Sequence, residues 1–197
     1  MTLASTKIGL GEFLTGWLTS TKTSKGRSTW RHYEQLIRMY IIPNLGEIKV
    51  RDLRPENIQA FYNRLFDGEV GVYTIRKIHI TLHSALQQAV RTGMIGRNPA
   101  SFVQPPKEPA SEMAILNESQ VSQLLIAAQG SRLETLIHLA VISGARQMEL
   151  LGLKWTDLDW VKRTLKIERQ LLKPEGEGVK FSSPKTRYGK RSISLGG

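Results

Sequence analysis

The sequence predicts a mainly α-helical protein with a small β-sheet, divided into two domains. Residues 10–92 hold apolar side chains three and four positions apart, which is the spacing of amphipathic helices. Residues 164–195 instead alternate apolar and polar side chains over short stretches, which is the spacing of strands. Between them, QPPKEPASE at 104–112 is rich in proline and lacks periodicity. We therefore expect a helical domain at 1–103, a linker at 104–112 and a domain with helices and a sheet at 113–197.

The helical domain is predicted to contain four helices. The first spans 10–21, and the second begins at Ser28 or Thr29, either of which can cap it, and ends at Pro43. Pro55 suits the first turn of the third helix, and the fourth and longest runs from about 73 to 92. Their apolar stripes are expected to form the core: Leu10, Phe13, Leu14, Trp17, Leu18, Trp30, Tyr33, Ile37, Tyr40, Ile41, Ile58, Phe61, Tyr62, Leu65, Ile75, Ile78, Leu82, Ala85, Leu86 and Ala89.

The second domain is predicted to begin with helices and to continue as strands. Asn117 can cap its first helix, and the segment 132–143 is apolar nearly all round, which predicts a buried helix that ends at Gly144. His138 on that helix and Trp155 after a third, short helix are expected in the core. Strands are predicted in TLKIERQLL, GVKFSS and KRSISL, with the turn of a hairpin within KTRYGKR, residues 185–191.

Positive charge is concentrated in the first half of the chain. The formal net charge is +11. Residues 1–107 hold 15 Lys and Arg against 7 Asp and Glu, whereas residues 108–197 hold 13 against 10. An excess of this kind favours a polyanionic partner, most simply nucleic acid.

The composition argues against several classes of protein. The absence of cysteine excludes disulfides and zinc held by cysteine, and the four histidines show no HExxH spacing. We expect neither a metal nor another cofactor. No apolar run reaches the length of a transmembrane helix, and the N-terminus lacks a signal pattern, so a soluble cytoplasmic protein without a membrane partner is expected.

One arginine stands in an unusual place in the second domain. In SGARQMELLGLKW, residues 143–155, Arg146 follows a turn of small residues and opens an apolar segment. A planar guanidinium can hold two oxygens of a phosphate at once. The alternative is an ion pair with Glu149, one turn further along the helix.

Three motifs in order resemble those of a known family. SGARQMELLGLKWTDLDW resembles the segment around the first catalytic arginine of the tyrosine recombinases, or phage integrases, and SSPKTRYGKRSISL resembles the family's β-hairpin with its catalytic lysine. The basic four-helix domain is similar to the family's core-binding (SAM-like) domain. The resemblance implies a site-specific DNA recombinase or integrase of a mobile element, bacterial or phage-encoded. Such an enzyme cleaves and rejoins strands through a 3′-phosphotyrosine and needs no metal or nucleotide.

The resemblance implies roles for individual residues. Arg146 would stabilise charge on the phosphate oxygens in the transition state, and Glu149 would orient Arg146. Lys185 would protonate the leaving 5′ oxygen. The alternative for Lys185 is a solvated turn lysine, and Lys190 and Arg191 are near competitors for its role.

Other parts of the family's active site are not found in these 197 residues. The family has a His-x-x-Arg box, a further His or Trp and a tyrosine nucleophile after the lysine. The five tyrosines, at positions 33, 40, 62, 73 and 188, do not match the position of the nucleophile. We therefore expect a chain that is truncated inside an α+β catalytic domain and is inactive alone.

Side chains of the first domain are candidates for DNA contact. In the family, two helices of the core-binding domain face DNA, and here these would be the second and fourth. Basic residues would contact phosphates, and His83 or Gln87 could reach base edges. An ordinary solvated face is the alternative for each residue. The candidates are Lys22, Lys25, Arg27, Arg31, Arg76, Lys77, His83 and Gln87.

The sequence is compatible with three functions. The first is a tyrosine recombinase that acts on double-stranded DNA and self-associates on it as a full-length protein. The second is a non-catalytic DNA-binding protein that occupies recombination sites. The third, a helical scaffold for an acidic protein, is disfavoured by the motifs around Arg146 and Lys185.

Overall fold

The computed structural model describes residues 7–108, 114–173, 178–184 and 189–195. The chain divides into two compact units, Met1–Ser111 (unit 1) and Glu112–Gly197 (unit 2). The fold is mainly helical with small antiparallel sheets, as predicted. Within the described ranges, no helix combines the length and the apolar character needed to cross a bilayer.

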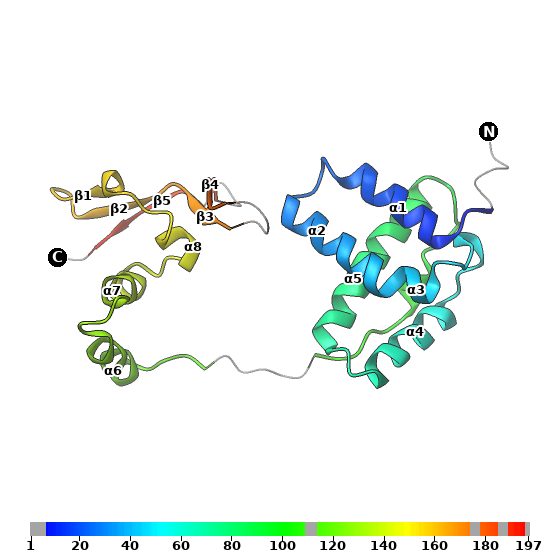
Figure 1. The fold of residues 1–197 in the computed structure, drawn as a ribbon, viewed down its shortest axis with the longest axis horizontal. Coiled ribbons are helices and arrows are strands. Elements are labelled where there is room, and N and C mark those ends of the chain that lie inside the picture. The colour runs from blue at the N-terminus through cyan, green and yellow to red at the C-terminus, as the bar shows by residue number, and fades with distance from the viewer. Residues whose placement is uncertain (1–6, 109–113, 174–177, 185–188, 196–197) are drawn as a thin grey trace. The chain divides into compact units, whose positions relative to one another are not determined.

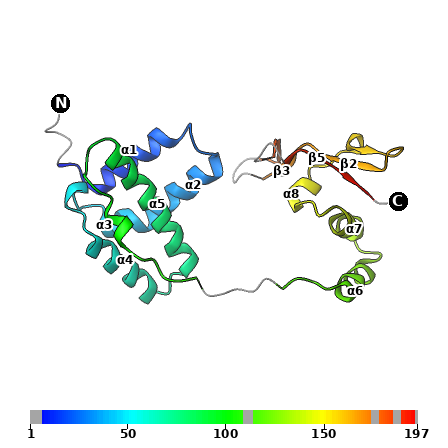
Figure 2. The same cartoon turned by 180° about the vertical axis from the view of Figure 1, so that it is seen from behind.

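Unit 1 is built from helices around the long helix α5, which contacts α2 and α4 (Figures 1 and 2). Its elements are α1 (Leu10–Thr21), α2 (Arg27–Leu36), the π-helical turn η2 (Ile37–Ile41), α3 (Ile42–Leu45), the 3-10 turn η3 (Val50–Asp52), α4 (Pro55–Asp67), α5 (Val72–Arg91) and the 3-10 turn η4 (Pro99–Phe102).

The core of unit 1 is formed by the predicted apolar stripes. Trp30, Tyr33 and Tyr40 are partly buried against this core, and the other predicted residues are buried in it. Pro55 occupies the first turn of α4, as expected. The stripes of α1, α4 and α5 all contribute to this one core because their spacing places each of them on one side of its helix.

The prediction that Pro43 ends the second helix is wrong. The helical path continues from α2 through η2 and α3 to Leu45. Proline interrupts an α-helix because it lacks an N–H group and its ring crowds the preceding turn. Here a wider π-helical turn precedes it, and Pro43 lies in the first turn of α3, where a missing donor is tolerated.

Unit 2 begins with helices and ends with short strands. The side chain of Asn117 caps its first helix by accepting a hydrogen bond from the N–H of Gln120 at 2.9 Å, as predicted. The elements are α6 (Glu118–Ala128), α7 (Glu134–Ser143), α8 (Gln147–Leu150), the 3-10 turn η5 (Trp155–Asp157), β1 (Leu158–Asp159), β2 (Thr164–Ile167), β3 (Gln170–Leu172), β4 (Lys180–Ser182) and β5 (Arg191–Ser194).

The strands pair differently from the predicted hairpin. Instead of pairing with each other, β4 pairs with β3 and β5 pairs with β2, so 185–191 is not the turn between two paired strands. Ile167 faces Arg191, and Gln170 faces Ser182. Residues 168–169 separate the two pairings along the chain from β2 to β3. Between β2 and β3, Arg169 forms an ion pair with the buried Asp157.

Unit 2 buries few apolar side chains. The prediction that the helix at 132–143 is buried is wrong, because no residue of α7 is buried and His138 is only partly covered. Trp155 is 84% exposed, which also contradicts its predicted place in the core. Contacts with α6 and α8 cover only part of the circumference of α7. Within the described part of unit 2, the buried apolar residues are Ala128, Leu150, Leu165 and Ile167.

Candidate functional site

Arg146 lies where the chain turns from α7 into α8. Gly144 ends α7 with a φ of +58°, a conformation that favours glycine. The N–H of Ala145 donates to Oγ of Ser143 at 3.2 Å and fixes the turn. Arg146 is the N-cap residue of α8 and has extended backbone. The predicted position of this arginine at the start of a helix is confirmed.

Glu149 holds Arg146 by both its backbone and its side chain. The backbone N–H of Arg146 donates to Oε2 of Glu149 at 3.1 Å, and Nη1 donates to Oε1 at 3.0 Å. The Glu149 side chain is 3% exposed, whereas that of Arg146 is 78% exposed. The ion pair considered as an alternative is therefore present, and it leaves most of the guanidinium facing solvent.

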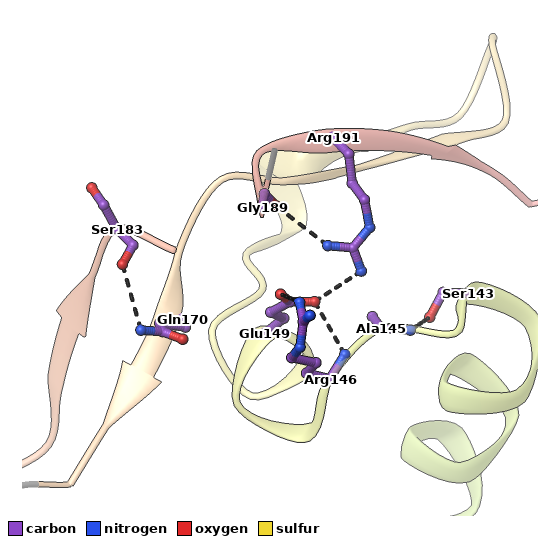
Figure 3. Close-up of polar contacts among 8 residues, drawn as sticks. All are labelled: Ser143, Ala145, Arg146, Glu149, Gln170, Ser183, Gly189 and Arg191. Carbon is purple, nitrogen blue, oxygen red and sulfur yellow. Dashed lines mark hydrogen bonds and ion pairs between the residues drawn. The ribbon is translucent and has the colours of Figure 1, made fainter. Parts of the chain in front are cut away.

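Arg191 of β5 binds the same carboxylate. Figure 3 shows its guanidinium between Glu149 and Gly189: Nη2 donates to Oε2 of Glu149 at 2.9 Å, and Nη1 donates to the Gly189 carbonyl at 3.3 Å. The Arg191 hydrogen bond, together with those from Arg146, lowers the pKa of Glu149 to about 2, although burial opposes the shift. At neutral pH, one buried negative charge is thus shared by two guanidinium groups.

The sequence interpretation missed this role of Arg191, which was considered only as a competitor of Lys185. Arg191 pairs with Ile167 and Ile193 pairs with Leu165, so these side chains share one face of the sheet. Ile167 and Leu165 are buried there. The sequence did contain a signal. In KRSISL, Arg191 stands two positions before Ile193 and therefore on the same face of the strand, where a charged side chain requires a partner.

Described residues just after β4 and just before β5 form hydrogen bonds at the two ends of the segment between these strands. Nε2 of Gln170 donates to the Ser183 carbonyl at 3.4 Å at one end, and Arg191 binds the Gly189 carbonyl at the other (Figure 3). A Cβ on Gly189 would overlap the Pro184 ring, so this close approach requires glycine. Lys185, the predicted general acid, lies outside the described residues, as does Tyr188. Its competitor Lys190 is exposed.

Four of the predicted DNA contacts lie near the loop between α1 and α2. Lys22 follows α1, with Nζ 5.5 Å from the ring centre of Trp30, and Lys25 is exposed in the loop. Arg27 begins α2, and Arg31 lies one turn later. These four basic residues therefore lie within the loop after α1 and the first part of α2.

His83 and Gln87 line a hollow of about 400 Å³ on α5, beside His79, Ile80, Ser84 and Arg91. Nε2 of His83 lies 3.1 Å from Oγ of Ser101. The buried Asn98, which was not predicted to matter here, donates to the His83 carbonyl at 3.1 Å and to Oε1 of Gln87 at 3.4 Å. The segment around η4 therefore positions both candidate base-reading residues.

Arg76 and Lys77 are neighbours in sequence but have different surroundings. Nε of Arg76 lies 2.8 Å from Oε1 of Glu108, and its Nη1 donates to the Pro106 carbonyl at 3.2 Å. Lys77 is exposed. Arg76 therefore attaches part of the predicted linker to α5. Within the described ranges, no three His, Asp or Glu side chains lie close enough together to hold a metal ion.

Comparison with known proteins identifies related sequences. The family model described as "Phage integrase, N-terminal SAM-like domain" matches residues 10–66. A tyrosine recombinase XerC-like protein of Caldanaerobacter subterraneus subsp. tengcongensis is 30% identical over 172 residues, which are 83% of this chain and 44% of that protein. An integrase of Saccharopolyspora erythraea is 31% identical over 162 residues, 81% of this chain and 37% of that protein. The chain thus spans less than half the length of either relative.

Solved structures share the fold. The Tn1549 transposon integrase in complex with a circular intermediate DNA matches with a TM-score of 0.84 and 22% identity over 95% of this chain and 61% of that chain. A lambda integrase dimer bound to a COC′ core site matches with a TM-score of 0.69 and 21% identity over 89% of this chain and 62% of that chain.

Proposed function

We propose, because this chain belongs to the tyrosine recombinase (phage integrase) family, that it binds double-stranded DNA at a recombination site and contributes to strand cleavage there. Residues 1–103 would bind DNA, residues 104–112 would link, and residues 113–197 would supply the first part of the catalytic domain. The observation that carries this proposal is the buried Glu149, which holds Arg146 and leaves its guanidinium exposed. A group held in this way can bind a phosphate without reorganising.

Arg146 and Lys185 would share the chemistry of cleavage. Charge develops on the non-bridging oxygens of the phosphate when a nucleophile attacks it, and the planar guanidinium of Arg146 can bind two of these oxygens. Lys185 would protonate the leaving 5′ oxygen. The attacking tyrosine, which forms the 3′-phosphotyrosine, is expected outside these 197 residues.

The proposed partner is double-stranded DNA. The net charge of +11 and the basic residues Lys22, Lys25, Arg27 and Arg31 support it, because phosphate contacts dominate the affinity of such proteins. The Tn1549 and lambda integrases are bound to DNA in their solved structures, and the latter is a dimer. By analogy, we propose that the full-length protein self-associates on DNA in the cytoplasm.

Covalent trapping tests the cleavage step. A duplex that binds the chain is first selected from a pool of random sequences. A nick is then placed near the cleavage site, so that cleavage releases a short strand and the covalent adduct cannot be reversed. The chain is joined after Gly197 to the C-terminal remainder of the 30% identical relative. We expect an adduct with this chimera and none with the 197 residues alone. Arg146→Ala should slow adduct formation by on the order of 10²- to 10³-fold, whereas Arg132→Ala, at an exposed position of unit 2, should not slow it.

Lys185 is distinguished from Arg146 by a sulfur substrate. Lys185→Ala should slow cleavage, and replacing the leaving oxygen with sulfur should restore it, because a thiolate leaves without a general acid. Sulfur should not rescue Arg146→Ala. If the Arg146→Ala variant cleaved at the full rate, the contact of Arg146 with Glu149 would be a structural ion pair without a role in cleavage. Sequence-selective binding without any adduct would favour the non-catalytic DNA-binding protein.

A further inference from the structure

Arg191 has no part in the chemistry proposed above, yet it binds the carboxylate on which Arg146 depends. Its side chain is 31% exposed. Because Arg191 pairs with Ile167 of β2, the two side chains lie on the same face of the sheet. Nη2 donates to Oε2 of Glu149 at 2.9 Å. This contact with Glu149 gives the charge of Arg191 a partner on an otherwise apolar face of the sheet, and it fixes the position of the guanidinium.

The carboxylate of Glu149 has little freedom to turn. Its Oε2 accepts hydrogen bonds from the backbone of Arg146 and from Arg191, which leaves Oε1 directed at Nη1 of Arg146. Rotation of the carboxylate would break two charge-assisted hydrogen bonds in a buried site, where they are costly to lose. Arg191 therefore fixes the orientation of the acceptor that orients Arg146.

The cluster of Arg146, Glu149 and Arg191 keeps a net positive charge. Arg146 and Glu149 alone would form a neutral pair, with weak attraction for an anion. Because Arg191 balances the carboxylate from its other side, one unit of positive charge remains, and the exposed guanidinium of Arg146 presents it to solvent.

Arg191 also connects this cluster to the neighbouring segment. Its Nη1 donates to the Gly189 carbonyl, and Gly189 lies against the ring of Pro184. These contacts hold together the two ends of the connection in which the sequence places Lys185. The side chain of Arg191 thus contacts both Glu149, which orients Arg146, and Gly189, which precedes β5.

We propose that Arg191 is a positioning residue that holds Glu149 in the orientation that presents Arg146 to a phosphate, and that it links Gly189 to the same carboxylate. This inference rests on the proposed function of Arg146. It assigns Arg191 no contact with the reacting atoms.

NMR of the 197-residue chain tests the proposal with Arg191→Met, Arg191→Lys and the control Lys166→Met. Lys166 is an exposed residue of β2, so the control removes one charge from the same sheet. Carboxyl ¹³C signals report the pKa of Glu149, and side-chain ¹⁵N signals report the rotation of the Arg146 guanidinium. We expect Arg191→Met to raise this pKa by about 1–3 units and to speed the rotation. Arg191→Lys should restore part of both, and Lys166→Met should change neither.

Unchanged rotation of Arg146 in folded Arg191→Met would overturn the proposal and leave Arg191 a structural residue. If Arg191→Met unfolds unit 2, Arg191→Gln, which keeps a donor without the charge, takes its place under the same criterion. Duplex binding provides a second readout. Arg191→Met should reduce the slope of log affinity against log salt by about 0.9 more than Lys166→Met does, because Arg146 then loses its contact with one phosphate. Equal slopes would overturn the link to phosphate. The NMR measurements contain no DNA, so a wild-type chain that fails to bind DNA refutes the proposed function alone.

Discussion

Glu149 is the residue on which the charged groups of unit 2 converge. Its side chain is almost completely buried and accepts hydrogen bonds from the backbone of Arg146 and from the guanidinium groups of Arg146 and Arg191. Removing Glu149 would leave both guanidinium groups without their buried partner, and removing either arginine would leave the buried carboxylate with fewer hydrogen bonds. Glu149 therefore stabilises unit 2 in addition to orienting Arg146.

The lowered pKa of Glu149 predicts a dependence of stability on pH. Its folded value of about 2 lies below the ordinary value of 4.5, so the unfolded chain takes up the proton first as the pH falls. The stabilisation should be complete well above pH 4.5, decline towards pH 2 and amount to roughly 3 kcal/mol. Urea unfolding between pH 7 and pH 3 should show this decline in the wild type and in Glu118→Gln, an exposed control, but not in Glu149→Gln. The same decline in both variants would contradict this assignment.

Part of the residue-scale site could be predicted because it is local. Arg146 and Glu149 are three positions apart on one short helix, so their contact follows from helical spacing. The contact between Arg191 and Glu149 spans 42 positions and depends on the pairing of β2 with β5. Alternation within a strand indicates which face a residue occupies but not which strand lies next to it, so this partner could not be predicted.

At the scale of elements, α5 divides its circumference between core and candidate DNA contacts. One side supplies buried residues to unit 1, and another carries His83, Gln87 and Arg76. Arg76 contacts the segment after η4, where Glu108 occupies its Nε group. A DNA phosphate would have to compete with this carboxylate for the arginine.

This competition predicts opposite effects of two substitutions on duplex binding. Arg76→Gln should weaken binding and reduce the salt slope by about 0.9, because one phosphate contact is lost. Glu108→Gln should strengthen binding up to about fivefold, since an exposed ion pair contributes at most about 1 kcal/mol. Glu56→Gln removes a different exposed carboxylate of unit 1 and is the control for net charge. If the variants at 108 and 56 bind equally well in fluorescence anisotropy, Glu108 does not compete with DNA.

Elements with a long, regular stripe were predicted well, and those that depend on distant contacts were not. The bounds of α1, α4 and α5 follow from local periodicity and from Pro55. The passage of the helix through Pro43 depends on the π-helical turn before it, which leaves no separate signal in the sequence. The pairing of β4 with β3 likewise depends on register, which short alternating segments leave open.

At the scale of the whole molecule, the two units differ in how much apolar surface they bury. Unit 1 has a continuous core drawn from every one of its long helices. The described part of unit 2 has four buried apolar side chains, and α7 has none. Periodicity shows that a helix is apolar but not which element covers it, so the burial of α7 was predicted wrongly.

The most direct test of the central claim, that Glu149 holds Arg146 ready for a phosphate, is the salt dependence of duplex binding by the 197-residue chain. Affinities are measured by fluorescence anisotropy over a series of salt concentrations for the wild type, Arg146→Gln and Arg132→Gln, whose side chain is exposed elsewhere in unit 2. The account predicts that the slope of log affinity against log salt falls by about 0.9 in Arg146→Gln and stays at the wild-type value in Arg132→Gln. A wild-type slope in Arg146→Gln, with Glu149 and Arg191 unchanged, would show that Arg146 meets no phosphate and would contradict the account.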